Sequence, residues 1–241
     1  MGILLIFFLA AVVLLGYRAL QHPVYRAYRE ASGNSWRRVL GDKGSYGEYL
    51  TFAKLSKLEG CRLLANLYVP KPDGTTTEID LVLLSENGIY VIESKNFGGW
   101  IFGSESSKYW TQMFNRQKRY QFFNPIWQNA GHISALKSVL HIQESESYKS
   151  VIVFSERCSL KQVSAGSSGA AIMKRNVLLQ LIKEDMLRST NRFSPADLDE
   201  MHSRLKRYAL ADEQTKAQHI RTIQHDDQPV IKSKTVIQRR K

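Results

Sequence analysis

Asp80, Glu93 and Lys95 are the residues whose types and spacing best suit chemistry on a charged substrate. Two neighbouring acids repel each other unless a cation lies between them, and a hard divalent ion with oxygen ligands meets that need. Because the group contains no histidine, its donors favour magnesium, with manganese as the alternative, over zinc or copper. Lys95 could then orient an attacking water and screen developing negative charge.

A β-hairpin is expected to bring these residues together. Residues 78–84 and 89–95 have the composition of strands, and Ser-Glu-Asn-Gly at residues 85–88 is typical of a tight turn. If all four residues form the connection, Leu84 pairs with Ile89. Counting back along both strands then sets Asp80 opposite Glu93.

A shorter turn at Asn87–Gly88 is the alternative connection. It would shift the register so that Asp80 lies opposite Lys95, with Glu93 on the diagonal. Because side chains alternate with period two, the three residues share one face of the hairpin in both registers.

A structural salt bridge would explain the same residues without catalysis. In that interpretation Asp80 pairs with Lys95, and Glu93 is a half-exposed strand residue. Glu-X-Lys alone is a weak motif, so its wider context has to separate the two interpretations.

That context is a series of residues ordered over more than a hundred positions. The series comprises Gly47-Glu48, Glu78-Ile79-Asp80-Leu81, Gly88-Ile89-Tyr90-Val91-Ile92-Glu93-Ser94-Lys95-Asn96, Gly99, Trp110, and Asn124-Pro125-Ile126-Trp127-Gln128-Asn129 with His132. It resembles the nuclease-related domain family over roughly residues 44–154. The resemblance implies the restriction-endonuclease-like fold of the Asp…(Asp/Glu)-X-Lys superfamily, a mixed central β-sheet flanked by helices.

The resemblance also implies roles for single residues. Glu48 corresponds to the acid on the first helix of the domain, and with Asp80 and Glu93 it completes a set of three metal-binding acids. Lys95 corresponds to the catalytic lysine.

A further element of the resemblance is Gln128 with His132. The pair is similar to the Gln-X-X-X-Tyr element of exonuclease-type relatives, which implies a catalytic role for Gln128. His132 stands where tyrosine is common, and a lone histidine on a helix is more often a structural residue.

A basic stretch from residue 106 to residue 143 contains no acid. Its basic residues alternate with aromatic ones, and these types attract phosphates and stack on unpaired bases. We therefore expect a nucleic-acid path in which Lys108, Arg116, Lys118 and Arg119 contact phosphates. At least half of the aromatic residues are expected to be core residues.

The overall charge agrees with a polyanionic partner. The 241 residues include 34 Lys or Arg against 22 Asp or Glu, a net charge of +12. Such an excess suits nucleic acid or an anionic membrane surface. Two cysteines are too few for a disulfide framework or a multi-cysteine zinc site and indicate a reducing compartment.

An apolar run, ILLIFFLAAVVLL at residues 3–15, predicts a membrane anchor. It is slightly shorter than the ~20 residues of a spanning helix. No positive charge precedes it and no small-residue cleavage site follows, which favours an anchor over a signal peptide. Five arginines between residues 18 and 38 place the rest of the chain in the cytoplasm by the positive-inside rule. A buried helix is the alternative.

The remaining sequence predicts an α/β domain, because strand and helix patterns interleave. Strands are expected at 61–69, 78–84, 89–95 and 150–154, and helices at 44–58, 124–140, 176–188 and 195–209, with Ser45 as the cap of the first helix. The expected parts are a transmembrane anchor at 1–20, a basic connector at 21–43, the nuclease-related domain at 44–160, its C-terminal helical part at 161–210 and a basic flexible tail at 211–241.

The leading interpretation is a membrane-anchored, magnesium-dependent nuclease that hydrolyses phosphodiester bonds in DNA. The alternative keeps the fold without turnover, as a membrane-tethered nucleic-acid-binding or scaffold module. A third interpretation, an adaptor on anionic lipid, explains the basic charge but not the acids.

Overall fold

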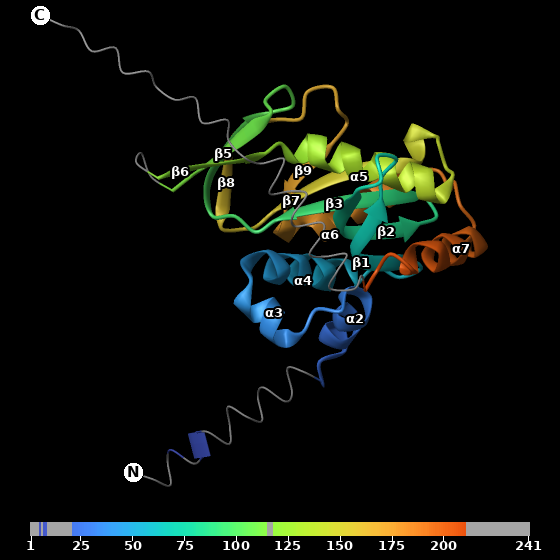
Figure 1. The fold of residues 1–241 in the computed structure, drawn as a ribbon, viewed down its shortest axis with the longest axis horizontal. Helices are drawn as coiled ribbons and strands as arrows, with labels where there is room; N and C mark the ends of the chain where they lie inside the picture. Colours follow the sequence, from blue (N-terminus) through green and yellow to red (C-terminus); the bar gives the residue numbers. More distant parts are fainter. Residues whose placement is uncertain (1–4, 6, 9–20, 115–117, 211–241) are drawn as a thin grey trace, which may run out of the picture.

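The computed structural model describes residues 5, 7–8, 21–114 and 118–210 (Figure 1). The helices are α2 (Pro23–Ser32), α3 (Trp36–Gly41), α4 (Lys43–Leu55), α5 (Pro125–Leu140), α6 (Arg175–Arg188) and α7 (Pro195–Lys206), with a short 3₁₀ helix at Ser145–Ser147. The strands are β1 (Arg62–Pro70), β2 (Thr76–Ser85), β3 (Gly88–Lys95), β4 (Gly99–Ser104), β5 (Tyr109–Met113), β6 (Arg119–Phe123), β7 (Tyr148–Phe154), β8 (Cys158–Ser164) and β9 (Ala171–Lys174).

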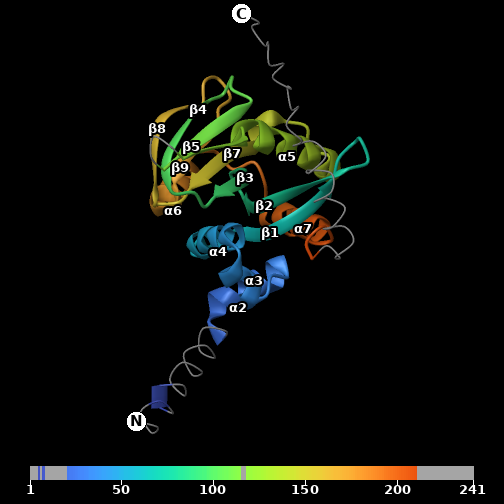
Figure 2. The same cartoon turned by 60° about the vertical axis from the view of Figure 1, so that its left-hand side comes forward.

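The strands form two mixed sheets. The five-stranded sheet has the order β1-β2-β3-β7-β9, in which β3, β7 and β9 run parallel. The four-stranded sheet has the order β6-β5-β4-β8 and stands apart from β1 and β2 in Figure 2. The α/β class is confirmed, with two mixed sheets where the resemblance implies one mixed central sheet flanked by helices.

Helices cover both faces of the five-stranded sheet. On one face, α5 and α7 pack Leu136 and Leu205 against apolar residues of β1, β2 and β3. On the other face, α4 and α6 contribute Phe52 and Leu178. Residues 23–41, which the sequence places in a connector, form α2 and α3 and add Tyr28 to the same core.

The β2–β3 hairpin has the first of the two predicted registers, but Ser85 also pairs with Gly88, so that only Glu86 and Asn87 form the turn and not all four residues 85–88. Leu84 pairs with Ile89, as the first register predicts, and the ladder runs back only as far as Leu81 paired with Ile92. The shorter turn at Asn87–Gly88 is therefore wrong.

The start of one helix is predicted correctly and that of another is not. Asn124 caps α5 by accepting a hydrogen bond from the N–H of Ile126, and Pro125 is the first helical residue, as predicted. The expected cap of α4 is wrong, because Asp42 accepts the capping bond from the N–H of Ser45. The helix therefore begins one residue earlier, at Lys43.

Two predicted segments lie largely outside the structure. Residues 1–4, 6 and 9–20 of the expected anchor and all of the expected tail at 211–241 are outside the described residues. Within the part of the chain that is described, no helix has the length and apolar character needed to cross a membrane.

Candidate active site

Glu93 is a buried acid near the end of β3, with 2% of its surface exposed. Its Oε1 lies 2.6 Å from Nζ of Lys95, and its Oε2 lies 3.0 Å from Nε2 of His132. Nδ1 of His132 lies 2.8 Å from the hydroxyl of Thr77. A neutral ring fits this chain if Nε2 donates to Glu93 and Nδ1 accepts from Thr77. Burial acts to raise the pKa of Glu93, but Lys95 and His132 outweigh it and hold the pKa at about 2.

Lys95, at the end of β3, contacts a residue of α5. Besides contacting Glu93, its Nζ donates a hydrogen bond to Oε1 of Gln128 at 3.0 Å. Gln128 and His132 lie on one face of α5 because residues four apart are neighbours on a helix. Burial acts to lower the pKa of Lys95, but the charges of Glu93 and Asp80 outweigh it and raise the pKa above its ordinary value. Lys95 is therefore an ammonium at neutral pH.

Asp80 lies one residue beyond the end of the β2–β3 ladder. Its Oδ2 accepts a hydrogen bond from the backbone N–H of Ser94 at 2.7 Å. The alternation of side chains also breaks here, because Ile79 packs in the same core cluster as Val82, whereas strict alternation would place it with Leu81. The expected direct pairing of Asp80 with Glu93 is therefore absent from the ladder.

The carboxylates nevertheless act on one another. Burial, followed by the charges of Glu93 and Glu48, raises the pKa of Asp80 well above its ordinary value. Three acids from two strands and one helix are thus within electrostatic reach of each other.

Glu48 reaches this group from α4. Nδ2 of Asn66 donates a hydrogen bond to its Oε2 at 3.1 Å, and the hydroxyl of Tyr28 lies 3.4 Å from the same oxygen. Burial, followed by the charge of Glu78, raises the pKa of Glu48 to about 7. The partners of the Glu48 carboxyl are thus an amide and a hydroxyl, and neither carries a positive charge.

Gly47 allows α4 to approach the end of β3. A Cβ at this position would overlap the side chain of Asn96. The buried Arg175 binds both partners, because its guanidinium donates to the carbonyl of Gly47 at 3.4 Å and to Oδ1 of Asn96 at 3.3 Å. The Gly-Glu pair therefore combines a close helix contact with an acid at the site.

Asn66 is a site residue that the sequence analysis does not identify. It falls in a gap of the β1–β2 ladder, opposite Asp80, with a left-handed φ of 52°. Nδ2 bridges Glu48 and Glu78, and the buried Oδ1 finds no hydrogen-bond partner among the described residues. An asparagine in an apolar strand pattern is the signal that could have identified it, because asparagine is depleted in strands and enriched at positive φ.

The acids offer the donor chemistry of a hard cation. Carboxylate oxygens with few nitrogen ligands suit magnesium. Burial is the first cause of the raised pKa values of Glu48 and Asp80, and the second is neighbouring negative charge, which a cation would relieve. Among the described residues, however, no three Asp, Glu, His or Cys side chains already form a metal-binding group. Coordination would require side chains to turn from their present partners.

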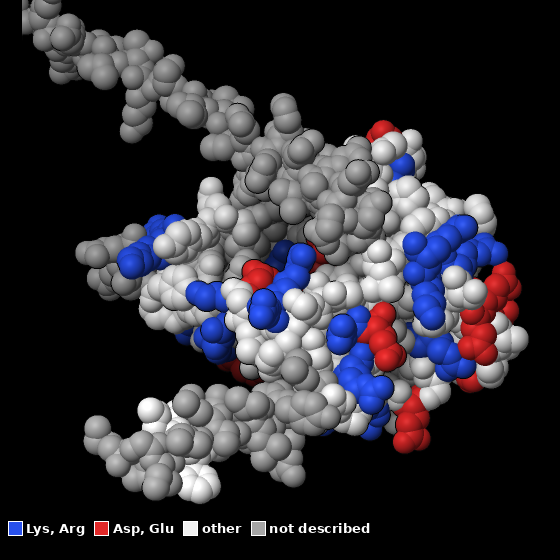
Figure 3. All heavy atoms as spheres, turned by 60° about the horizontal axis from the view of Figure 1, so that its bottom comes forward, with Lys and Arg blue, Asp and Glu red and all other residues white. Residues whose placement is uncertain are grey.

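The predicted phosphate-contacting residues belong to the other sheet. Lys108 precedes β5, and Lys118 and Arg119 lie at the start of β6, where all three are exposed. The strands β5 and β6 form a hairpin. Figure 3 shows basic side chains at its projecting end. Arg116 lies outside the described residues. The described basic residues thus lie at the four-stranded sheet, whereas Asp80 and Glu93 lie on the five-stranded sheet.

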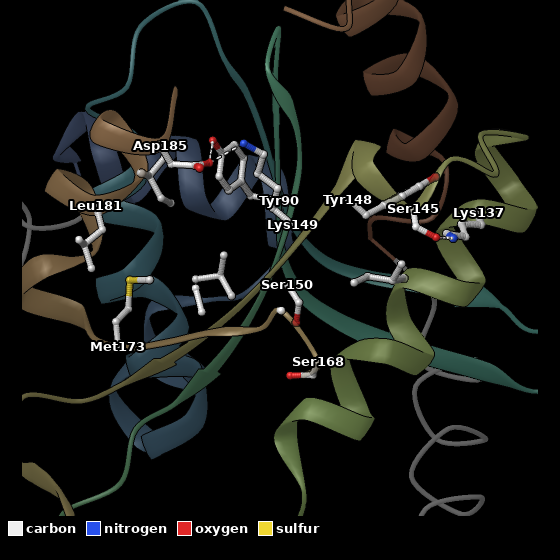
Figure 4. Close-up of a pocket in the computed structure, with 15 residues that line it drawn as sticks. Tyr90, Lys137, Ser145, Tyr148, Lys149, Ser150, Ser168, Met173, Leu181 and Asp185 are labelled. Atoms are coloured by element: carbon white, nitrogen blue, oxygen red, sulfur yellow. Dashed lines mark hydrogen bonds and ion pairs between the residues drawn. The ribbon is translucent and has the colours of Figure 1, made fainter. Parts of the chain in front are cut away.

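A pocket of about 580 Å³ lies elsewhere, between α5, β7 and α6 (Figure 4). On one side of it, Asp185 accepts hydrogen bonds from Lys149 at 2.5 Å and from Tyr90 at 2.7 Å. None of the predicted site residues lines this pocket.

Comparison with known proteins agrees with the resemblance. The family model of the nuclease-related domain matches residues 43–155. An uncharacterized protein of Bacillus anthracis is 38% identical over 143 residues, which cover 58% of this chain and 66% of that protein. The chain therefore matches slightly less than two thirds of that relative's length. No solved structure matches the chain.

Proposed function

We propose that residues 43–155, which match the family model of the nuclease-related domain, form a magnesium-dependent nuclease that hydrolyses phosphodiester bonds in DNA. The observation that carries the proposal is the buried pair of Glu93 and Lys95 beside Asp80 and Glu48. Strongly shifted pKa values in one cluster are typical of catalytic sites. The restriction-endonuclease-like fold implied by the family places such acids at a cleavage centre.

Each residue has a proposed role. Glu48, Asp80 and Glu93 would hold the magnesium ion, with manganese as the alternative. A bound divalent ion supplies charge neutralisation and lowers the pKa of water. The Lys95 ammonium would donate a hydrogen bond to the attacking water or to a phosphate oxygen, and Gln128 would keep it in position.

His132 would orient Glu93 rather than take part in proton transfer. Its ring is buried between Thr77 and Glu93 and is 2% exposed. A substrate could therefore reach Lys95 more readily than His132, because the side chain of Lys95 is 17% exposed.

Nucleic acid and the membrane are the proposed partners. The exposed Lys108, Lys118 and Arg119 support binding of DNA phosphates, as does the net charge of +12. The apolar run at 3–15 and the arginines after it support a single-pass anchor in the cell membrane, with the domain in the cytoplasm.

A non-catalytic nucleic-acid-binding module is the second candidate. The favouring observation is that protein groups already engage the acids: Glu93 contacts Lys95 and His132, and Asp80 contacts the N–H of Ser94. In this candidate the acids are structural partners and no turnover occurs.

Digestion of labelled DNA by the full-length protein separates the two candidates. We expect cleavage in millimolar magnesium, none in EDTA, and loss of cleavage in Asp80→Asn. Glu59→Gln is the matched control, because Glu59 is an exposed acid on the turn between α4 and β1. Equal cleavage by wild type and Asp80→Asn, or none by either in any divalent metal, would exclude the proposed nuclease site.

A further inference from the structure

The two faces of the four-stranded sheet differ in burial. One face packs Ile101, Trp110 and Phe122 against Ile152 and Phe154 of β7. The ring of Trp110 stacks on that of Phe154, with centroids 6.2 Å apart. The remaining side chains of these strands lie on the opposite face, and Trp100, Tyr109 and Phe123 among them belong to none of the described core clusters.

Register places several aromatic residues on that outer face. Tyr109 pairs with Phe123, and Trp100 pairs with Met113, which in turn pairs with Arg119. Because residues two apart share a face, Trp100, Tyr109 and Phe123 point away from the core that contains Trp110.

These rings are exposed although they are large and apolar. Trp100 and Tyr109 are each 40% exposed, and Phe123 is 36% exposed. Trp127, from the first turn of α5, is 41% exposed and lies against Phe123 with ring centroids 6.2 Å apart. We refer to Trp100, Tyr109, Phe123 and Trp127 as the aromatic strip.

The strands of this sheet carry basic but no acidic side chains, and Glu105 lies in the loop between β4 and β5. The strands β4, β5, β6 and β8 contain no Asp or Glu, whereas they include Arg119 and Lys161. Nζ of Lys161 lies 5.8 Å from the ring centre of Trp100, and Nζ of Lys108 lies 5.4 Å from that of Tyr109. A ligand with flat apolar groups and negative charge complements this surface.

We infer that the aromatic strip binds single-stranded nucleic acid, with unpaired bases stacked on its rings and phosphates beside its lysines and arginine. Unpaired bases expose their π-faces, whereas the bases of a duplex stack on each other and leave only edges and phosphates. The inference deepens the proposed function, on which it rests, by naming single strands as the substrate class.

The chain connects the strip to the candidate active site at two places. Trp100 follows Lys95 after the short loop between β3 and β4, and Trp127 directly precedes Gln128, which binds Lys95. The aromatic strip therefore lies next to the Glu93–Lys95 pair along the chain at both of these places.

A second copy of the chain is a less suitable occupant. In a two-fold interface the same patch meets itself, so the basic Arg119, Lys161 and Lys108 would lie opposite a surface that is also basic. Such like charges oppose association, whereas phosphates neutralise them.

Fluorescence anisotropy of the full-length protein in EDTA tests the inference without cleavage. The probes are a labelled oligothymidylate of about 12 nucleotides, its oligouridylate counterpart and a duplex of the same length. The variants are Trp100→Ala and Phe123→Ala. The matched control is Tyr120→Ala, an exposed aromatic on the same strand as Phe123 whose side chain belongs to the opposite face.

We expect wild type to bind the single strands more tightly than the duplex. Each strip variant should weaken single-strand binding about tenfold and duplex binding less than about twofold, while Tyr120→Ala stays within about twofold. Circular dichroism should show an unchanged fold, because the replaced rings are exposed.

Three results would overturn the inference: equal losses on single strand and duplex, no loss in either strip variant, or a wild-type dimer that Phe123→Ala dissociates. Asp80→Asn separates this inference from the proposed function. If neither wild type nor Asp80→Asn cleaves DNA but both bind single strands through the strip, the nuclease proposal fails and the binding inference stands.

Discussion

The carboxylate of Asp80 accepts a hydrogen bond from the backbone N–H of Ser94, 2.7 Å away, where the ladder between β2 and β3 has ended. A side chain thus replaces a strand partner and keeps a backbone donor satisfied. The same carboxyl lies within reach of the charges of Glu48 from α4 and Glu93 from β3. The end of this ladder is therefore the point at which elements on both sides of the sheet meet.

Asp80→Asn should retain the fold and lose activity. The amide oxygen can still accept from Ser94, and removal of one negative charge relieves repulsion, so stability should be unchanged or higher by up to about 1 kcal/mol. Cleavage should fall by at least about 100-fold. Urea unfolding and digestion of labelled DNA measure the two effects. If Asp80 is only a structural partner of its neighbours, Asp80→Asn should instead lower stability and leave any cleavage unchanged.

Lys95→Ala should destabilise the protein in EDTA by about 3 kcal/mol, because it leaves the buried Glu93 charge without its cation. Millimolar magnesium should restore part of the loss by placing another cation near the acids. Thermal melts with and without magnesium measure both. The control is Lys71→Ala, which removes an exposed pair with Asp73 and should cost less than about 1 kcal/mol. Melting points of wild type and Lys95→Ala that both ignore magnesium would contradict a metal site.

Gly47→Ala and Gly131→Ala should have opposite effects, although both replace a glycine within a helix. A Cβ at residue 47 overlaps Asn96, whereas a Cβ at residue 131 meets no atom within 4 Å. We expect Gly47→Ala to lower stability and activity, because α4 must move with Glu48. Gly131→Ala should raise stability by about 0.5–1 kcal/mol through helix propensity. Chemical denaturation measures the free energy of unfolding of both variants. Equal changes in that free energy would contradict the close packing of α4 against Asn96.

Asp185→Asn should destabilise the protein more at neutral than at acidic pH. Burial acts to raise the pKa of Asp185, but hydrogen bonds from Lys149 and Tyr90 outweigh it and lower the pKa. A lowered folded pKa contributes stability that is complete above the ordinary Asp value of about 4 and is lost as the pH falls through the folded value. Urea unfolding from pH 7 to pH 3 should therefore show the wild-type advantage shrinking. Glu184→Gln is the control, and an advantage that grows toward acid would refute the assignment.

Nucleic-acid binding should depend strongly on salt. Each phosphate contact contributes about −0.7 to the log–log salt slope on single strands. Replacing Lys108, Lys118 and Arg119 together with alanine should make the slope shallower by about 2. Anisotropy titrations from low to high salt measure it. The control replaces Lys57, Lys183 and Arg188, which are exposed on other elements, and should leave the slope unchanged.

Much of the five-stranded sheet could be predicted because its signals are local. The turn sequence at residues 85–88 sets the register of Leu84 with Ile89, and Asn124 with Pro125 marks the start of α5. Turn chemistry, caps and periodicity act over a few residues and can be read along the chain.

The four-stranded sheet could not be predicted in the same way. β4 pairs with β8, which lies more than fifty residues further along the chain, and β5 and β6 are only five residues each. The pairing of β4 with β8 depends on a distant partner, and strands as short as β5 and β6 carry a weak signal in their own sequence. Only the pairing shows that Trp110 faces the core while Tyr109 faces outward.

The candidate site shows the same division. The acids, the lysine and the hairpin that carries most of them could be predicted from the residues alone. The contacts of Glu93 with Lys95 and His132, the contact of Asp80 with Ser94 and the place of Asn66 in the site are visible only in the folded protein. The physical reason is that hydrogen bonds and buried charges depend on distances between side chains from separate elements. Those distances arise only when α4 and α5 pack on opposite faces of one sheet.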